Sequence, residues 1–90
     1  MAVYTIDIRP RARRSLRQLD ASARKRIASV IDGLASEPRP ADVTALKGHR
    51  PWLRTRVGDY RIIYAVDDRA RLVTIAAIGH RREVYRDLNL

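Results

Sequence analysis

The sequence feature that most restricts the fold is a β-hairpin signal at Gly58-Asp59. Two segments rich in β-branched and aromatic residues flank this dipeptide, residues 52–57 and residues 60–66. A glycine at the first central position favours a two-residue type II′ turn, because only that position needs a positive φ. A turn of two residues also fixes the register of its two strands. The sequence therefore predicts an antiparallel strand pair in which each residue has a defined partner.

In this register the hairpin has one basic face and one apolar face, because side chains on a strand alternate between two sides. The basic face carries Trp52, Arg54, Arg56 and Arg61, with Arg56 directly opposite Arg61. Like charges in such a pair destabilise a sheet by roughly 0.2–1 kcal/mol. A sheet that receives a polyanion would accept that cost, since an arginine fork matches phosphate oxygens. We interpret the basic face as the functional surface; the alternative is a set of solvated arginines.

The rest of the chain predicts one more strand before the hairpin, two helices, and a last strand after it. Residues 2–8 alternate in the pattern of a strand with one apolar face. A proline at a first helical position predicts a helix over 10–18, and Asp20 is a suitable N-cap for a second helix to about residue 35. A third long strand is expected over 71–79 after a turn. We therefore expect an α+β fold, in which an N-terminal strand and a two-helix hairpin precede antiparallel strands of one sheet, with helices on one face and the other face free.

Length and charge restrict the class of protein. The 90 residues suffice for a single domain over 1–90, and 19 Lys and Arg against 10 Asp and Glu give a net charge of +9. Such a balance favours an anionic partner. The apolar run over 72–78 is far shorter than the ~20 residues that span a bilayer, and the N-terminus does not read as a signal peptide. With no cysteine for disulfides or thiolate sites, we expect a cytoplasmic protein without membrane contact.

Several segments, taken in order, carry a resemblance to a known family. The hairpin segment 56–64 is followed by Ala77-Ile-Gly-His-Arg-Arg-Glu-Val-Tyr-Arg86, and the helix segments 12–19 and 27–34 precede it. This ordered set resembles the RelE/ParE superfamily of toxins from prokaryotic type II toxin-antitoxin modules, and most of all its RelE branch. The resemblance covers nearly the whole chain.

The resemblance implies a RelE-like, microbial-RNase-like fold and a definite activity. Members of the RelE branch enter the A site of the 30S ribosomal subunit and cleave mRNA there, which inhibits translation. The resemblance further implies a cognate antitoxin that wraps around the toxin, so that the two form a hetero-oligomer. No cofactor is expected.

Carried over by position, the family's basic cluster falls on residues that the hairpin had already indicated in part. Arg61 and Arg81 are expected to grip the scissile phosphate, and Arg54 and Arg56 to hold neighbouring phosphates. The aromatic that follows is Tyr85. Further contacts to RNA are expected from Lys47, Arg82 and Trp52, the last by stacking on a nucleobase. Trp52 is equally compatible with a half-buried position in the sheet.

Cleavage of RNA by its own 2′-hydroxyl needs a proton acceptor, a proton donor and cations that stabilise the phosphate in the transition state. Arginine remains protonated in proteins and cannot be the acceptor. His80 and Tyr85 are the candidates for proton transfer, and His80 is expected to take over part of the role of lysines that the family places near Trp52 and Arg54. The alternatives are a surface or capping histidine and a tyrosine that only packs or stacks.

A metal mechanism is not expected, because Asp67 and Asp68 suit a turn and the other acidic residues are scattered along the chain.

Two other functions stay open. The ParE branch shares the fold but inhibits DNA gyrase, and the presence of Arg61, Arg81 and Tyr85 favours the RNase branch over it. The second alternative is a basic module that binds RNA or antitoxin without catalysis.

Overall fold

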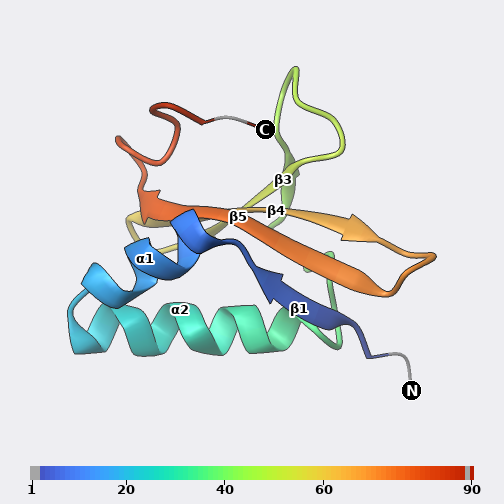
Figure 1. The fold of residues 1–90 in the computed structure, drawn as a ribbon, viewed down its shortest axis with the longest axis horizontal. Coiled ribbons are helices and arrows are strands. Elements are labelled where there is room, and N and C mark those ends of the chain that lie inside the picture. Colours follow the sequence, from blue (N-terminus) through green and yellow to red (C-terminus); the bar gives the residue numbers. More distant parts are fainter. Residues whose placement is uncertain (1–2, 89) are drawn as a thin grey trace.

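The computed structural model describes residues 3–88 and 90. Two helices lie against one side of a five-stranded sheet, and the C-terminal segment, residues 81–88, lies on the other side (Figure 1). The elements in chain order are β1 (Thr5–Ile8), α1 (Pro10–Gln18), α2 (Ala21–Leu34), β2 (Thr44–Ala45), β3 (Leu53–Val57), β4 (Tyr60–Asp67) and β5 (Leu72–His80). This arrangement confirms the predicted α+β fold.

The sheet is mixed, with the strand order β1-β5-β4-β3-β2. The pairs β2–β3, β3–β4 and β4–β5 are antiparallel, as expected for β3 to β5, whereas β1 runs parallel to β5 from Thr5↔Leu72 to Ile8↔Ile75. The last strand therefore lies between the first strand and β4. The short strand β2 lies within the stretch that the sequence had indicated as a loop, and it pairs with β3 only at Thr44↔Arg54 and Ala45↔Leu53.

Both helices begin and end close to the predicted residues, because their signals are local. Pro10 opens α1. The Asp20 carboxylate caps α2 by accepting a hydrogen bond of 2.8 Å from the N–H of Ala23, and the helix ends at Leu34. Such a cap satisfies a donor that the first turn of a helix leaves without a backbone partner. In the part of the chain that the structure describes, neither helix is long and apolar enough to cross a membrane.

The hairpin has the predicted register throughout. Val57 pairs with Tyr60, and Arg56 pairs with Arg61. Gly58 has a φ of +60°, and its partner in the turn, Asp59, is not among the residues with positive φ. This combination matches the type II′ turn, in which only the first central residue needs a positive φ.

The main core lies between the helices and the apolar face of the sheet. Tyr64 is fully buried there, and its hydroxyl donates a hydrogen bond of 2.7 Å to the carbonyl of Pro38. Burial raises the pKa of Tyr64 to about 12. The buried members of this core are Ala12, Ile27, Ile31, Leu34, Val57, Ile62, Tyr64, Val73, Ile75 and Ile78.

The opposite face of the sheet is not free, which corrects the expectation from sequence. Ile63 and Ala77 point to this side and are buried together with Val84 of the C-terminal segment. Leu46, Trp52 and Leu88 pack around them. Apolar side chains on this face exclude water only if something covers them, and the C-terminal segment supplies the cover. The basic face therefore surrounds a second, small apolar cluster.

Candidate functional site

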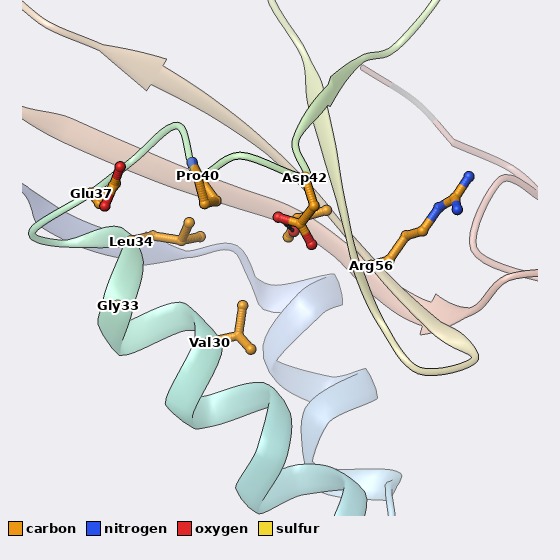
Figure 2. Close-up of a pocket in the computed structure, with 8 residues that line it drawn as sticks. Val30, Gly33, Leu34, Glu37, Pro40, Asp42 and Arg56 are labelled. Atoms are coloured by element: carbon orange, nitrogen blue, oxygen red, sulfur yellow. Dashed lines mark hydrogen bonds between the residues drawn. The ribbon is translucent and has the colours of Figure 1, made fainter.

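Strand alternation gathers Arg54, Arg56 and Arg61 on the side of the sheet away from the helices. Arg54 and Arg56 are two residues apart on β3, and Arg56 pairs directly with Arg61 of β4. Their neighbour Thr55 points to the other side, toward α2, where it is buried. Figure 2 shows the cavity on that side, of about 310 Å³, between α2 and β3, and the Arg56 side chain extends away from it. The predicted basic face is therefore present in the fold.

Arg61 is held in place by the hairpin itself. Its Nη1 donates hydrogen bonds of 3.0 Å to the Gly58 carbonyl and 2.9 Å to the Tyr60 carbonyl, and only 9% of the residue is exposed. Both bonds use one nitrogen of the guanidinium, so they fix its position at the turn. Arg56, directly opposite, is exposed. The like-charged pair thus consists of one fixed cation and one that faces solvent.

Tyr85 of the C-terminal segment meets Arg54 on this face. Arg54 Nη1 donates a hydrogen bond of 3.1 Å to the Tyr85 hydroxyl, and 37% of Tyr85 is exposed. A phenolic oxygen that accepts a hydrogen bond can still donate its own hydrogen to a third group. The two residues, predicted separately for the site, are therefore brought together with the phenol open to solvent.

His80 lies on the other side of the sheet. It pairs with Tyr60, whose side chain faces the helices, and the two rings meet edge to face with centroids 6.2 Å apart. The His80 Nδ1 also accepts a hydrogen bond of 3.3 Å from the backbone N–H of Arg82. Gly79 takes the place opposite Arg61, so alternation turns the next residue away. The structure does not bring His80 to the basic face.

The remaining predicted cations lie around the site. Arg81 follows β5, is exposed, and donates its backbone N–H to the Asp59 carbonyl at 2.8 Å, which ties it to the turn that fixes Arg61. Arg82 is exposed next to it. Lys47 is exposed in the loop between β2 and β3, which rises on the same side of the sheet as the C-terminal segment (Figure 1).

Trp52 is on the basic face, as predicted, but its ring is partly occupied. It is half-buried against the second apolar cluster, and the Arg9 guanidinium carbon lies 5.2 Å from the centroid of its ring. A guanidinium at this distance from an indole makes a cation–π contact. These neighbours favour a half-buried position in the sheet for Trp52 over stacking on a nucleobase. Sequence reasoning missed Arg9, although the alternation of side chains along residues 5–9 indicates the face of the sheet on which Arg9 lies.

Sequence reasoning also missed Arg11, a residue of α1. The Arg11 Nη1 donates a hydrogen bond of 2.7 Å to the Asp87 carbonyl. Its Nη2 donates to the carbonyls of Arg86 at 2.8 Å and Val84 at 3.4 Å. No pattern within the helix distinguishes Arg11 from its exposed neighbours, because its partners are more than 70 residues away in the chain.

The family model and the curated relative that match this chain both describe toxins. A family model described as the ParE toxin of type II toxin-antitoxin systems, parDE, matches residues 6–85. A curated Methanocaldococcus jannaschii protein, named RelE1 and provisionally described as a toxin, is 29% identical over 87 residues, which cover 93% of this chain and 97% of that one.

Solved structures extend the likeness to the fold. A chain of the archaeal RelE-RelB complex from Pyrococcus horikoshii aligns with a TM-score of 0.78 and 30% identity, covering 92% of this chain and 99% of that one. A chain of the toxin-antitoxin complex RelBE2 from Mycobacterium tuberculosis aligns with a TM-score of 0.76 and 29% identity, covering 92% and 97%. The residues matched by the family model include the basic face and Tyr85.

Proposed function

The chain belongs to the ParE toxin family of type II toxin-antitoxin systems and is RelE-like, and from this premise we propose that it is an endoribonuclease that cleaves mRNA in the ribosomal A site. Its partner is a cognate antitoxin, as the complexes among its structural relatives indicate. The proposed reaction needs no metal ion. The resulting loss of intact mRNA would inhibit translation.

The observation that carries the proposal is the contact between Arg54 and Tyr85. A phenol that can exchange a proton lies 3.1 Å from a guanidinium, on a face that also holds Arg56 and Arg61. RNA cleavage needs a proton-transfer group within reach of several fixed cations. Among the side chains that contact the arginines of the basic face, Tyr85 suits proton transfer, since arginine remains protonated.

In the proposed reaction the 2′-hydroxyl of a ribose attacks the adjacent phosphorus and loses its proton to solvent. A new bond forms between the 2′-oxygen and phosphorus, and the bond from phosphorus to the 5′-oxygen breaks. Tyr85 donates its proton to the leaving 5′-oxygen, while Arg61 and Arg81 stabilise the additional negative charge on the phosphate. Arg54 orients the phenol, and Arg56 holds a neighbouring phosphate. The products carry a 2′,3′-cyclic phosphate and a 5′-hydroxyl.

The experiment is a cleavage assay with ribosomes programmed with a short mRNA, in which the ends of the products are mapped and their chemistry determined. Wild-type protein is expected to give cleavage within the A-site codon and 2′,3′-cyclic phosphate ends. The Tyr85→Phe variant removes one oxygen atom and is expected to cleave roughly 10²–10⁴-fold more slowly, which is the usual contribution of a general acid or base. Tyr4→Phe is the matched control, because Tyr4 bonds Asp68 far from the site.

A Tyr85→Phe variant that cleaves at the wild-type rate would contradict the role of the phenol.

Gyrase inhibition is the second candidate function, favoured by the ParE description of the matching family. It predicts DNA breaks trapped on gyrase, with the mRNA intact. A protein that does neither, while it still binds RNA or antitoxin, would be a non-catalytic basic module.

A further inference from the structure

The C-terminal segment that carries Tyr85 has little regular structure of its own. After Arg81, whose N–H bonds the Asp59 carbonyl, its backbone–backbone bonds are local turns, from the N–H groups of Glu83 and Val84 to the His80 carbonyl and from that of Arg86 to the Glu83 carbonyl. Within the segment Val84 is buried, and Asp87 has a φ of +51°. Such a segment needs contacts with the rest of the molecule to keep one conformation.

The open side of β5 is where those contacts lie. Strand β1 ends at Ile8, which pairs with Ile75, so the remainder of β5 from residue 76 onward has no strand on that side. The start of α1 and the C-terminal segment meet there, around a cavity of about 280 Å³ lined by Arg11, Ala76, Asp87 and Leu88 among others. A residue of α1 can therefore reach the backbone of the C-terminal segment.

We propose that Arg11 is a positioning residue for Tyr85. Its guanidinium bonds the carbonyls of Val84 and Arg86, the residues on either side of Tyr85, and that of Asp87. Holding both neighbours fixes the backbone from which the Tyr85 side chain extends toward Arg54. A planar fork with five N–H donors can span three carbonyls, whereas the compact ammonium of lysine cannot match that geometry.

The kinetic consequence rests on the proposed ribonuclease activity. Replacing Arg11 leaves Arg56 and Arg61 in place, because neither is held by the C-terminal segment, so the KM for RNA is expected to change little. The phenol would lose its fixed position, and small displacements of a reacting group can reduce a rate by about 10²-fold. We expect Arg11→Gln to lower kcat by roughly 10- to 100-fold, and Arg11→Lys to recover part of that loss.

A second readout does not depend on activity. Trp52 is the single tryptophan of the chain, and it packs in the same cluster as Val84 and Leu88. Release of the C-terminal segment would expose its ring to water. Arg11→Gln is therefore expected to shift the Trp52 emission to longer wavelength and to increase its quenching by acrylamide, with the far-ultraviolet circular dichroism unchanged. Arg14→Gln removes the same charge from an exposed position of the same helix and is expected to change neither signal.

The two readouts separate failure of this proposal from failure of the proposed function. If the wild-type protein cleaves no RNA, the ribonuclease assignment fails, and Trp52 quenching alone decides whether Arg11 anchors the segment. If Trp52 in Arg11→Gln behaves as in wild type, the anchoring is overturned whatever the activity. If Trp52 becomes accessible but kcat is unchanged in an active enzyme, the positioning role is overturned. Loss of kcat at constant KM, together with exposure of Trp52, supports it.

Discussion

Arg54 and Arg61 lie on neighbouring strands and face the same side, yet they are held in different ways. Arg61 bonds two backbone carbonyls of its own turn, so its charge is in place before any ligand arrives. Arg54 bonds a side chain of the C-terminal segment, so its orientation depends on that segment. A cation that needs no rearrangement contributes most to stabilising charge that develops during a reaction. In the proposed ribonuclease reaction, Arg61 is accordingly better suited than Arg54 to stabilise the scissile phosphate.

Strand alternation predicted the side of Arg54, Arg56 and Arg61, but it did not settle the side of the residues at the end of β5. The side of His80 depends on the register between β4 and β5, which contains an irregularity between Ile63 and Tyr64. A shift of one residue moves every later side chain to the opposite face. The sequence shows no local sign of that irregularity, so the placement of His80 could be read only from the structure.

Tyr64 makes the stability of the protein sensitive to alkaline pH. Burial raises its pKa from 10.0 to about 12. Below about pH 10 the phenol is neutral in both the folded and the unfolded chain. Between pH 10 and 12 it ionises mainly in the unfolded chain, so the free energy of unfolding falls as the pH rises. A difference of two pKa units corresponds to roughly 2–3 kcal/mol.

Denaturant unfolding of the wild type and of Tyr64→Phe at pH 8 and pH 11 tests this. The variant loses the hydrogen bond to Pro38, which is expected to lower its stability at pH 8 by roughly 0.5–1.5 kcal/mol. It should then lose less stability than the wild type between the two pH values. Equal losses in both proteins would show that the Tyr64 phenol does not govern the alkaline transition.

At the level of the hairpin, Gly58 is required by the backbone of the turn. Its φ of +60° lies in a region that residues with a Cβ rarely adopt, and a Cβ built there would lie 2.8 Å from Arg26 Nη2. The arginine end can move, so the cost is mainly backbone strain. Gly58→Ala is expected to lower the free energy of unfolding by roughly 1–2 kcal/mol.

The same substitution in α2 is the control and should have the opposite sign. A Cβ on Gly33 meets nothing within 4 Å, and the residue is helical, where alanine is more stable than glycine by roughly 0.5–1 kcal/mol. Gly33→Ala is therefore expected to stabilise the protein. Denaturant unfolding measures both variants. If their midpoints shifted in the same direction, the assignment of strain to the turn would be contradicted.

The elements that could be predicted are those with local signals. Pro10, Asp20 and Gly58 each mark the start of a helix or the turn of a hairpin within a few residues, and all three positions are confirmed. The parallel pairing of β1 with β5, and the contact of α1 with the C-terminal segment, join parts far apart in the chain. No turn or helix cap encodes such long-range contacts, so they follow only from the packing of the whole chain.

Across the whole molecule, the net charge of +9 attracts any polyanion, but only some cations should touch it. Each contact with a phosphate of single-stranded RNA contributes about 0.7 to the slope of log K against log salt. Arg56→Gln is expected to reduce this slope by roughly that amount. Arg17→Gln, an exposed change of equal charge on α1, should leave the slope nearly unchanged.

Fluorescence anisotropy of a labelled single-stranded RNA, titrated at several salt concentrations, measures both slopes. Equal reductions in the two variants would mean that RNA is attracted by the overall charge and does not settle on the basic face. A reduction confined to Arg56→Gln would locate the bound backbone on the side of the sheet opposite the helices, next to Tyr85.

The position of β5 between β1 and β4 also has a consequence for the order of events during synthesis. The strand that joins the two parts of the sheet is translated after both of its neighbours, and Tyr85 follows it. A nascent chain that ends before residue 72 therefore holds the arginines of the hairpin but neither the strand that completes the sheet nor the phenol. The toxin therefore assembles its proposed catalytic groups only after β5 and Tyr85 have both been translated.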